Sequence, residues 1–386
     1  MPERRFARRR ESAEQRATWL ELFYDLVFVF AVTELSHHLL NDLTWRGAGQ
    51  SALLLLVVWW SWNYTTWVTN ELDPDSFVVR LLMIGLMLAS LLMSIAIPEA
   101  FGPRALLFVG SYLAIQIGRH AFLTFAAAGP GTLERERAGR ILIWFAAAGV
   151  FWVAGAVAGG TARVVLWLVA LALDYGAPVV VFYVPGRKRL EDNAWQVETS
   201  HFSERFALFV IIALGESIVV TGATTSDLAL SFTRVLALAI AFLGSAALWW
   251  LYFARVVQVA QQELERAEHR TTVARDAYTY LHVVLVAGII VTAVGDELVI
   301  AHPRDSLTHA EVAAVVAGPA IYLLAHTLIR LRLIGSVNPR RLGGAAACAV
   351  VGLAAASAPA LVLGGLVLLV LIAVVGLDQL AAARRA

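Results

Sequence analysis

The sequence predicts an all-α integral membrane protein with about twelve transmembrane helices, arranged as two six-helix repeats, and with both termini in the cytoplasm. Of its 386 residues, 59% are hydrophobic and only 15% are charged, and apolar runs of about 20 residues recur along the whole chain. A soluble domain is nearer to about 45–50% apolar and about 25% charged. The mean hydropathy of +0.72 agrees with this excess. Because a single soluble core cannot use so much apolar surface, we expect lipid to cover the remainder.

The apolar runs define the predicted spans in order. The last two are the shortest, and only the turn signal of Ser357 to Pro359 separates them. The predicted spans are 19–40, 48–69, 78–97, 104–126, 140–158, 163–184, 205–222, 233–254, 277–299, 311–329, 343–358 and 360–378.

The cationic residues predict the orientation. Most of the Arg and Lys residues lie in segments that would all face the cytoplasm if the N-terminus does, and this asymmetry is typical of an even number of spans. The arginines of the predicted external loops are Arg46, Arg104, Arg163, Arg234 and Arg304. The basic tail 1–18 is expected to contact anionic lipid head groups through Arg8, Arg9 and Arg10. Glu21 and Asp25 interrupt the first apolar run, which argues against a cleaved signal peptide.

The two halves of the chain resemble copies of each other. Glu34 matches Glu216, and the pair Trp59-Trp60 matches Trp249-Trp250, in the same order of spans. The repeats would be 19–184 and 204–386, joined by the polar cytoplasmic linker 185–203. Six spans in each half predict repeats of parallel rather than inverted orientation, with a pathway at their interface. Chance recurrence of these residues in apolar helices is the alternative.

Ionisable residues inside the spans are the candidate functional groups, because each costs about 2.5–3.5 kcal/mol at a helix centre on insertion scales. Glu216 is the strongest candidate because of its depth in span 205–222. Glu21 and Asp25 share one helix face, whereas Glu34 and His38 share the opposite one. The candidate proton or ion pathway residues are Glu216, Glu34, Asp25, Glu21, His38, Glu204, Arg119, His120 and Asn63.

Purely structural roles are the alternatives to these functional assignments. Glu21 and Asp25 lie at a helix start, where the helix dipole suits carboxylates. Glu216 would serve packing alone if it formed an ion pair with Arg119 or His120.

Composition and motifs exclude several classes of function. The net charge of +1 gives no support for nucleic-acid binding, and the single Cys348 rules out a cysteine-rich metal site. Glu34 and His37 have the Glu-x-x-His spacing of carboxylate metal sites, but no second copy exists. We therefore expect no metal and no cofactor. Neither a phosphate-binding loop nor a hydrolase motif occurs, so an enzyme is not expected.

Two stretches, Glu21 to Val32 and His201 to Ser217, resemble the bacterial low temperature requirement protein A (LtrA) family. The resemblance covers nearly the whole chain and implies a protein of the bacterial inner membrane. The first helix is also similar, over one short window, to the Phe-Ser-Asp signature of a potassium-channel family built on six-helix repeats. Tyr24 stands at the serine of that signature, Trp19 at its arginine, and Leu208 at the aspartate of its second half.

These observations favour a transporter or channel that moves protons, a small cation or a small solute between the two halves. The alternatives are a membrane structural or lipid- and cold-adaptation protein without flux, and a membrane-embedded enzyme acting on lipid. The expected partners are membrane lipids and the transported species, and a homodimer is left open.

Overall fold

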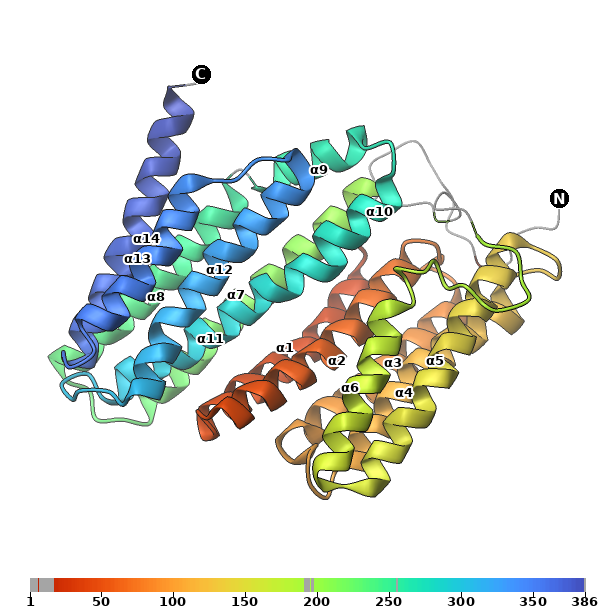
Figure 1. Cartoon of the computed structure of the whole chain (residues 1–386), viewed down its shortest axis with the longest axis horizontal. Helices are drawn as coiled ribbons and strands as arrows, with labels where there is room; N and C mark the ends of the chain where they lie inside the picture. Colours follow the sequence, from red (N-terminus) through yellow and green to blue (C-terminus); the bar gives the residue numbers. More distant parts are fainter. Residues whose placement is uncertain (1–5, 7–16, 191–194, 196–197, 255, 385–386) are drawn as a thin grey trace. The chain divides into compact units, whose positions relative to one another are not determined.

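The computed structural model is built from helices and is drawn in Figure 1. It describes residues 6, 17–190, 195, 198–254 and 256–384. Within these residues there is no β-strand, and the one isolated bridge joins Ser306 to Pro359. The all-α class predicted from the apolar runs is therefore confirmed.

The helices begin and end close to the predicted spans, and two turns of π-helix extend them. One π-helical turn, η2 (Leu123–Ala127), continues α4, and the other, η4 (Arg275–Leu281), precedes α11. A short 3-10 turn, η1 (Ile97–Glu99), follows α3. The α-helices of the described residues are α1 (Trp19–Asn41), α2 (Trp45–Thr69), α3 (Phe77–Ala96), α4 (Ala105–Phe122), α5 (Leu133–Ala158), α6 (Gly160–Gly176), α7 (Thr199–Ser226), α8 (Phe232–Phe253), α9 (Val256–Arg266), α10 (Arg270–Ala274), α11 (His282–Ala301), α12 (His309–Ile334), α13 (Pro339–Ala354) and α14 (Ala360–Ala383).

In the described part of the chain, eight helical segments are long and apolar enough to cross a membrane. The predicted spans 19–40, 48–69, 163–184 and 343–358 also coincide with helices but are not among the eight. For two of them the reason is length, since α6 has 17 residues and α13 has 16, below the 18 residues required. The count of twelve crossings and the orientation of the termini stay predictions. The eight segments are Phe77–Glu99, Ala105–Ala127, Leu133–Ala158, Thr199–Ser226, Phe232–Phe253, Arg270–Ala301, His309–Ile334 and Ala360–Ala383.

The chain divides into two compact units. Unit 1 contains residues 1–34 and 53–202, and unit 2 contains residues 35–52 and 203–386. Unit 1 thus holds most of α1 and α2, α3 to α6 and the first residues of α7. Unit 2 holds the rest of α7, α8 to α14, and the adjoining ends of α1 and α2. The predicted duplication of two six-helix repeats remains a prediction.

The helix α3 has an apolar face that the protein does not cover. Phe77, Leu81, Ile84 and Leu88 follow one another at spacings of four and three residues, so they form one stripe, and each is more than half exposed. The opposite face, with Val79, is buried. A soluble protein rarely leaves such a continuous apolar stripe open to water, so we interpret it as a surface for lipid.

Helices α11 and α12 approach each other closely within unit 2 because glycines lie at their contact. A Cβ atom at Gly318 would lie 2.4 Å from the backbone nitrogen of Thr292, and one at Gly295 would lie 2.8 Å from the Cα of Val315. Real Cβ contacts are essentially never shorter than 3.0 Å. Small residues of this kind let membrane helices pack backbone against backbone.

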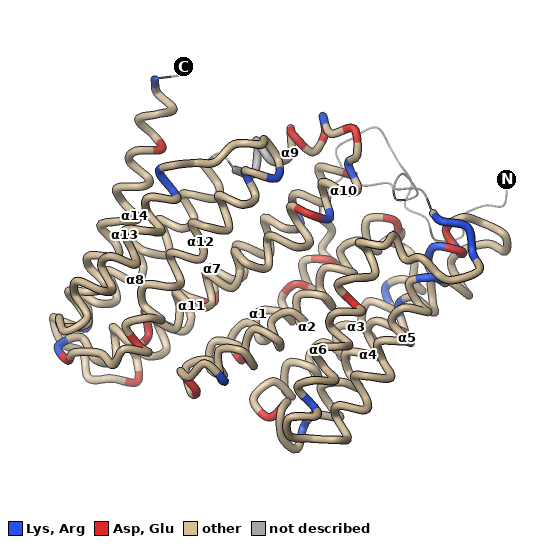
Figure 2. Tube along the Cα trace, in the orientation of Figure 1, with Lys and Arg blue, Asp and Glu red and all other residues tan. Residues whose placement is uncertain are grey.

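Charged residues are scarce along the helices of each unit. In Figure 2 the helices are mostly uncharged, and the charged positions lie chiefly near helix ends and in loops. The predicted lipid contacts of Arg8, Arg9 and Arg10 lie outside the described residues. The few charged side chains that do lie inside the helix bundles are therefore the natural place to look for a site.

Candidate functional site: buried charges within unit 1

Glu21 connects the start of α1 to a distant histidine. One carboxylate oxygen, Oε2, accepts hydrogen bonds from the backbone nitrogen and the hydroxyl of Thr18, each at 2.8 Å. The backbone nitrogen of Glu21 in turn donates to the hydroxyl of Thr18, which completes a capping box at the helix start. The other oxygen, Oε1, lies 2.9 Å from Nε2 of His201. Glu21 therefore caps α1, as its position at the helix start indicates, and also binds a buried imidazole.

The imidazole of His201 contacts two polar side chains. Its Nδ1 lies 3.3 Å from the amide oxygen of Asn70, and its Nε2 lies 2.9 Å from Oε1 of Glu21. All three side chains are buried.

Asp25 lies one turn further along α1 and is fully buried. Its Oδ1 accepts a hydrogen bond of 2.8 Å from the indole nitrogen of Trp62 on α2. The Trp62 side chain is likewise fully buried, so this contact lies inside the unit. The indole N–H of Trp62 is a neutral donor.

Arg119 on α4 is fully buried and is held by neutral oxygens. Its Nη1 donates to the hydroxyl of Thr65 at 2.6 Å and to the carbonyl of Ser61 at 3.3 Å. Its Nη2 donates to the side-chain oxygen of Gln116. In the described part of the chain Arg119 makes no ion pair with a carboxylate, and its Nε has no hydrogen-bond partner.

A hydroxyl group joins the environments of Asp25 and Arg119. Tyr24, the neighbour of Asp25 on α1, donates to the hydroxyl of Thr65 at 2.8 Å, and the same hydroxyl accepts from Arg119. Trp62 and Thr65 lie on adjacent turns of α2. We call this group the unit 1 polar cluster, and its members are Tyr24, Asp25, Ser61, Trp62, Thr65, Gln116 and Arg119.

The polar groups follow the axis of α2 from its C-terminal end into the bundle. Asn70 lies just beyond the last residue of α2, and Ser61 lies nine residues earlier, which corresponds to about 13 Å of helix rise. The contact of Glu21 with His201 lies at the Asn70 end, and the unit 1 polar cluster lies deeper.

A further buried carboxylate lies in the same unit. Oδ2 of Asp174 on α6 accepts hydrogen bonds from Tyr112 at 2.6 Å and from Trp152 at 2.9 Å. Its Oδ1 has no hydrogen-bond partner among the described residues. On α4, Tyr112, Gln116 and Arg119 share one face, at spacings of four and three residues. Tyr112 donates to Asp174 and Gln116 accepts from Arg119, so one face of α4 contacts both charged groups.

The remaining predicted residues of unit 1 have simpler surroundings. His120 is buried, its Nδ1 lies 2.9 Å from the carbonyl of Gln116, and its ring packs against Phe145. It is therefore a histidine of the packed core. Asn63 is buried in α2, and Glu34, the last residue of unit 1 on α1, is half-buried.

Three predicted residues lie in unit 2. Glu216 is buried in α7, and beside it the hydroxyl of Ser217 lies 3.1 Å from that of Ser245 on α8. Glu204 is half-buried near the start of α7. Nδ1 of His38 lies 2.9 Å from the hydroxyl of Ser51.

His282 in unit 2 lies among tyrosine side chains. Nε2 of His282 lies 3.1 Å from the hydroxyl of Tyr252, and its Nδ1 lies 2.8 Å from the carbonyl of Ala277. The ring of Tyr278 stacks on that of His282, and the Tyr278 hydroxyl lies 2.9 Å from that of Ser203. Within the residues that the structure describes, no group of three or more His, Cys, Asp or Glu side chains could hold a metal ion.

Long apolar helices, uncovered apolar faces and a few buried charges define a multi-pass membrane protein. The chain belongs to the bacterial low temperature requirement A protein (LtrA) family, whose family model matches residues 16–376. It is also 38% identical over 333 residues to an uncharacterised protein of Rhizobium meliloti (strain 1021), covering 86% of this chain and 81% of that one. No solved structure matches the chain.

Proposed function

We propose that this LtrA-family protein resides in the bacterial cytoplasmic membrane and moves protons or a small cation across it. The observation that supports the proposal is the unit 1 polar cluster. It contains a buried carboxylate, Asp25, bonded to an indole, and a buried guanidinium, Arg119, bonded to neutral oxygens. Each such charge costs about 2.5–3.5 kcal/mol at the centre of a membrane helix on insertion scales. A function that uses the charge explains why the sequence retains it.

In this proposal the termini are cytoplasmic, as the distribution of arginines indicates. The pair of Glu21 and His201 then lies toward the cytoplasmic end of unit 1, and the unit 1 polar cluster lies deeper in the membrane. Protons would enter at Glu21 and His201, and Asp25 would be the deeper acceptor. Glu216 in α7 is a second buried carboxylate for the same chemistry. Catalysis of a reaction is no part of the proposal.

The rival proposal is a structural protein whose buried charges only hold helices together. Arg163 favours this proposal, because its guanidinium donates hydrogen bonds only to backbone carbonyls among the described residues. These are the carbonyls of Gly102, Gly155 and Ala156. Such contacts fix the backbone and need no transported species. The unit 1 polar cluster differs because, among the described residues, Arg119 is held by neutral oxygens and makes no ion pair with a carboxylate, although direct pairing is the simplest way to make a buried charge tolerable.

Flux through liposomes distinguishes the two proposals. The purified protein would be reconstituted into liposomes that contain a pH-sensitive dye, and proton entry would be driven by a potassium gradient with valinomycin. We expect Asp25→Asn to lose most of the flux of the parent, because the amide cannot accept a proton yet keeps an oxygen for Trp62.

The matched control is Asp75→Asn, since Asp75 is exposed and pairs with Arg80 outside the cluster. It should retain parental flux. Equal flux in Asp25→Asn and the parent, with both proteins folded, would remove Asp25 from the pathway. A parent protein that transports neither protons, potassium nor sodium above empty liposomes would favour the structural role.

A further inference from the structure

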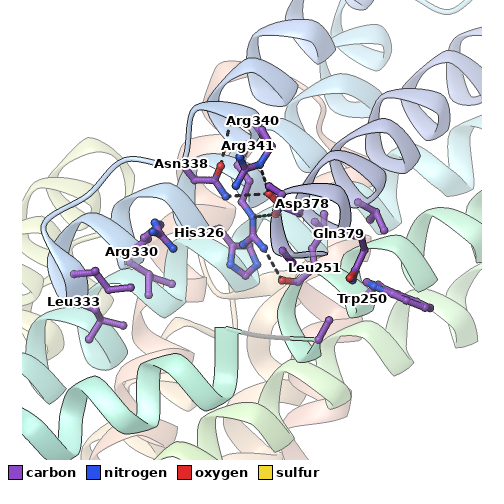
Figure 3. A pocket seen from close by; sticks show the side chains of 16 residues that line it. Trp250, Leu251, His326, Arg330, Leu333, Asn338, Arg340, Arg341, Asp378 and Gln379 are labelled. Carbon is purple, nitrogen blue, oxygen red and sulfur yellow. Dashed lines mark hydrogen bonds and ion pairs between the residues drawn. The ribbon is translucent and has the colours of Figure 1, made fainter. Parts of the chain in front are cut away.

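Unit 2 contains a cavity of about 210 Å³ where four helices end or begin. It is lined by the C-terminal parts of α8, α12 and α14 and by the start of α13 (Figure 3). The local sequence makes this arrangement possible. Gly335 ends α12 in the left-handed conformation, with φ of 68°, and the side chain of Asn338 then caps α13. The tight connection brings the arginines that begin α13 to the cavity wall.

Positive charge exceeds negative charge at this cavity. Arg330, Arg340 and Arg341 line it, against the single carboxylate of Asp378. Asp378 accepts from Nε of Arg340 at 2.7 Å and from Nε of Arg341 at 3.0 Å. Asn338 adds a weaker contact of 3.3 Å. One carboxylate therefore orients two guanidinium groups, and the arginines that line the cavity outnumber its carboxylates.

Arg340 and Arg341 differ in how many of their guanidinium N–H donors are already used within the protein. Nη2 of Arg341 donates to the carbonyl of Leu251 at 3.0 Å, so this residue also holds α13 against α8. Arg340 binds Asp378 through Nε, and in the described part of the chain its terminal nitrogens make no hydrogen bond. A planar guanidinium anchored at Nε presents those nitrogens to a second acceptor, and oxyanions such as phosphate fit them well.

His326 supplies a second and independent observation. Its ring is only 2% exposed and lines the cavity, between the rings of Tyr322 and Tyr252. Among the described residues neither ring nitrogen has a hydrogen-bond partner. Buried polar side chains are nearly always satisfied by protein, water or ligand. Because the ring lines the cavity, a bound molecule there is the available partner.

The rim of the cavity is apolar and open. Trp250 and Ile334 line it, and their side chains are 48% and 39% exposed. The volume suits a compact anionic group with some water, and lies below the roughly 300–1,000 Å³ typical of sites for drug-sized ligands. A basic recess with an apolar mouth, near the ends of apolar helices, is the arrangement that binds phospholipid head groups.

We propose that this cavity binds a phosphate group, with Arg340 and Arg330 as its cationic donors and His326 as a polar contact. The phosphate belongs to an anionic phospholipid or to a soluble phosphate compound. The site lies in unit 2 and uses none of the residues of the unit 1 polar cluster, so it stands whether or not the protein transports ions.

Calorimetric titration of the purified protein in neutral detergent tests the proposal with two probes. One probe is inorganic phosphate, and the other is short-chain phosphatidylglycerol, with a neutral galactosyl diacylglycerol of the same chain length as the lipid control. We expect saturable binding of at least one phosphate probe and none of the control lipid. Binding of the lipid probe alone identifies a head-group site, and binding of inorganic phosphate alone identifies a site for soluble phosphate.

Variants assign the binding to the cavity. Arg340→Gln and Arg330→Gln should each weaken it by about tenfold or more, since each removes a charge-assisted donor. Arg341 is left intact because it also holds Leu251. The matched control is Arg80→Gln, an exposed arginine of unit 1 that should bind as the parent does. The proposal is overturned if the parent binds neither phosphate probe, or if both cavity variants bind with parental affinity.

Discussion

Nε2 of His201 lies 2.9 Å from Oε1 of Glu21, although 180 positions separate the two residues in the sequence. The contact joins the start of α7 to the start of α1 inside unit 1. Both partners belong to the two stretches that carry the LtrA resemblance. Their pairing gives a physical reason why these two stretches characterise the chain together.

His201→Ala should destabilise the protein by about 1–3 kcal/mol, because it leaves a buried carboxylate oxygen of Glu21 without this donor. Thermal unfolding in detergent, followed by tryptophan fluorescence, measures the loss. The exposed His309 provides a control, since His309→Ala removes no buried contact. A parental midpoint for His201→Ala would mean that the contact contributes nothing to stability.

Tyr112→Phe should cost about 1–3 kcal/mol of stability, since Asp174 would keep the indole of Trp152 as donor but lose its hydroxyl donor at 2.6 Å. Tyr183→Phe serves as the comparison, because the Tyr183 side chain is 37% exposed. The same unfolding assay applies to both. If both variants have the unfolding midpoint of the parent, the hydroxyl of Tyr112 does not stabilise the protein through Asp174.

Gly318→Ala should disrupt the packing of α11 on α12, because the added Cβ would lie 2.4 Å from a backbone nitrogen. We expect a loss of about 1–3 kcal/mol, the usual cost of overpacking. Gly85→Ala is the control, because no atom lies within 4 Å of the new Cβ and the substitution creates no clash. It should be neutral or slightly stabilising, because alanine is the better helix former. Equal stability of both variants would contradict the close helix contact.

The uncovered stripe on α3 should face lipid. A spin label at Ile84→Cys, in a protein whose buried Cys348 is replaced by alanine, should collide more with dissolved oxygen than with a water-soluble nickel complex. A label at Asp75→Cys, in an exposed loop, should show the reverse preference. A label at position 84 that favours the nickel complex would place this face in water.

Apolar run length was sufficient to predict the helices. Each predicted span overlaps a helix, because a long apolar segment in lipid must satisfy its own backbone hydrogen bonds. The span 163–184 was predicted too long, since α6 ends at Gly176. Ser357 and Pro359 were enough to locate the break between α13 and α14. Apolar run length did not determine the number of membrane crossings. The helices α6 and α13 have 17 and 16 residues, which is short for a helix that crosses a membrane.

The partners of the buried charges could not be predicted. Asp25 and Arg119 stand out in the sequence because charge is expensive in an apolar segment, and both are buried. Nothing in the apolar run of α2 marks Trp62 as the donor to Asp25, since an indole reads as one more hydrophobic residue. His201 was visible only as part of a short motif near a span edge, and its contact with Glu21 depends on tertiary packing.

The most direct test of the account is whether the parent protein carries current. Proteoliposomes adsorbed to a solid-supported membrane would be exposed to rapid jumps in proton, potassium or sodium concentration. The account predicts a transient current for at least one of these ions that is absent from protein-free liposomes and strongly reduced by Asp25→Asn and by Glu216→Gln. Folded parent protein that gives no current with any of the three ions would contradict it.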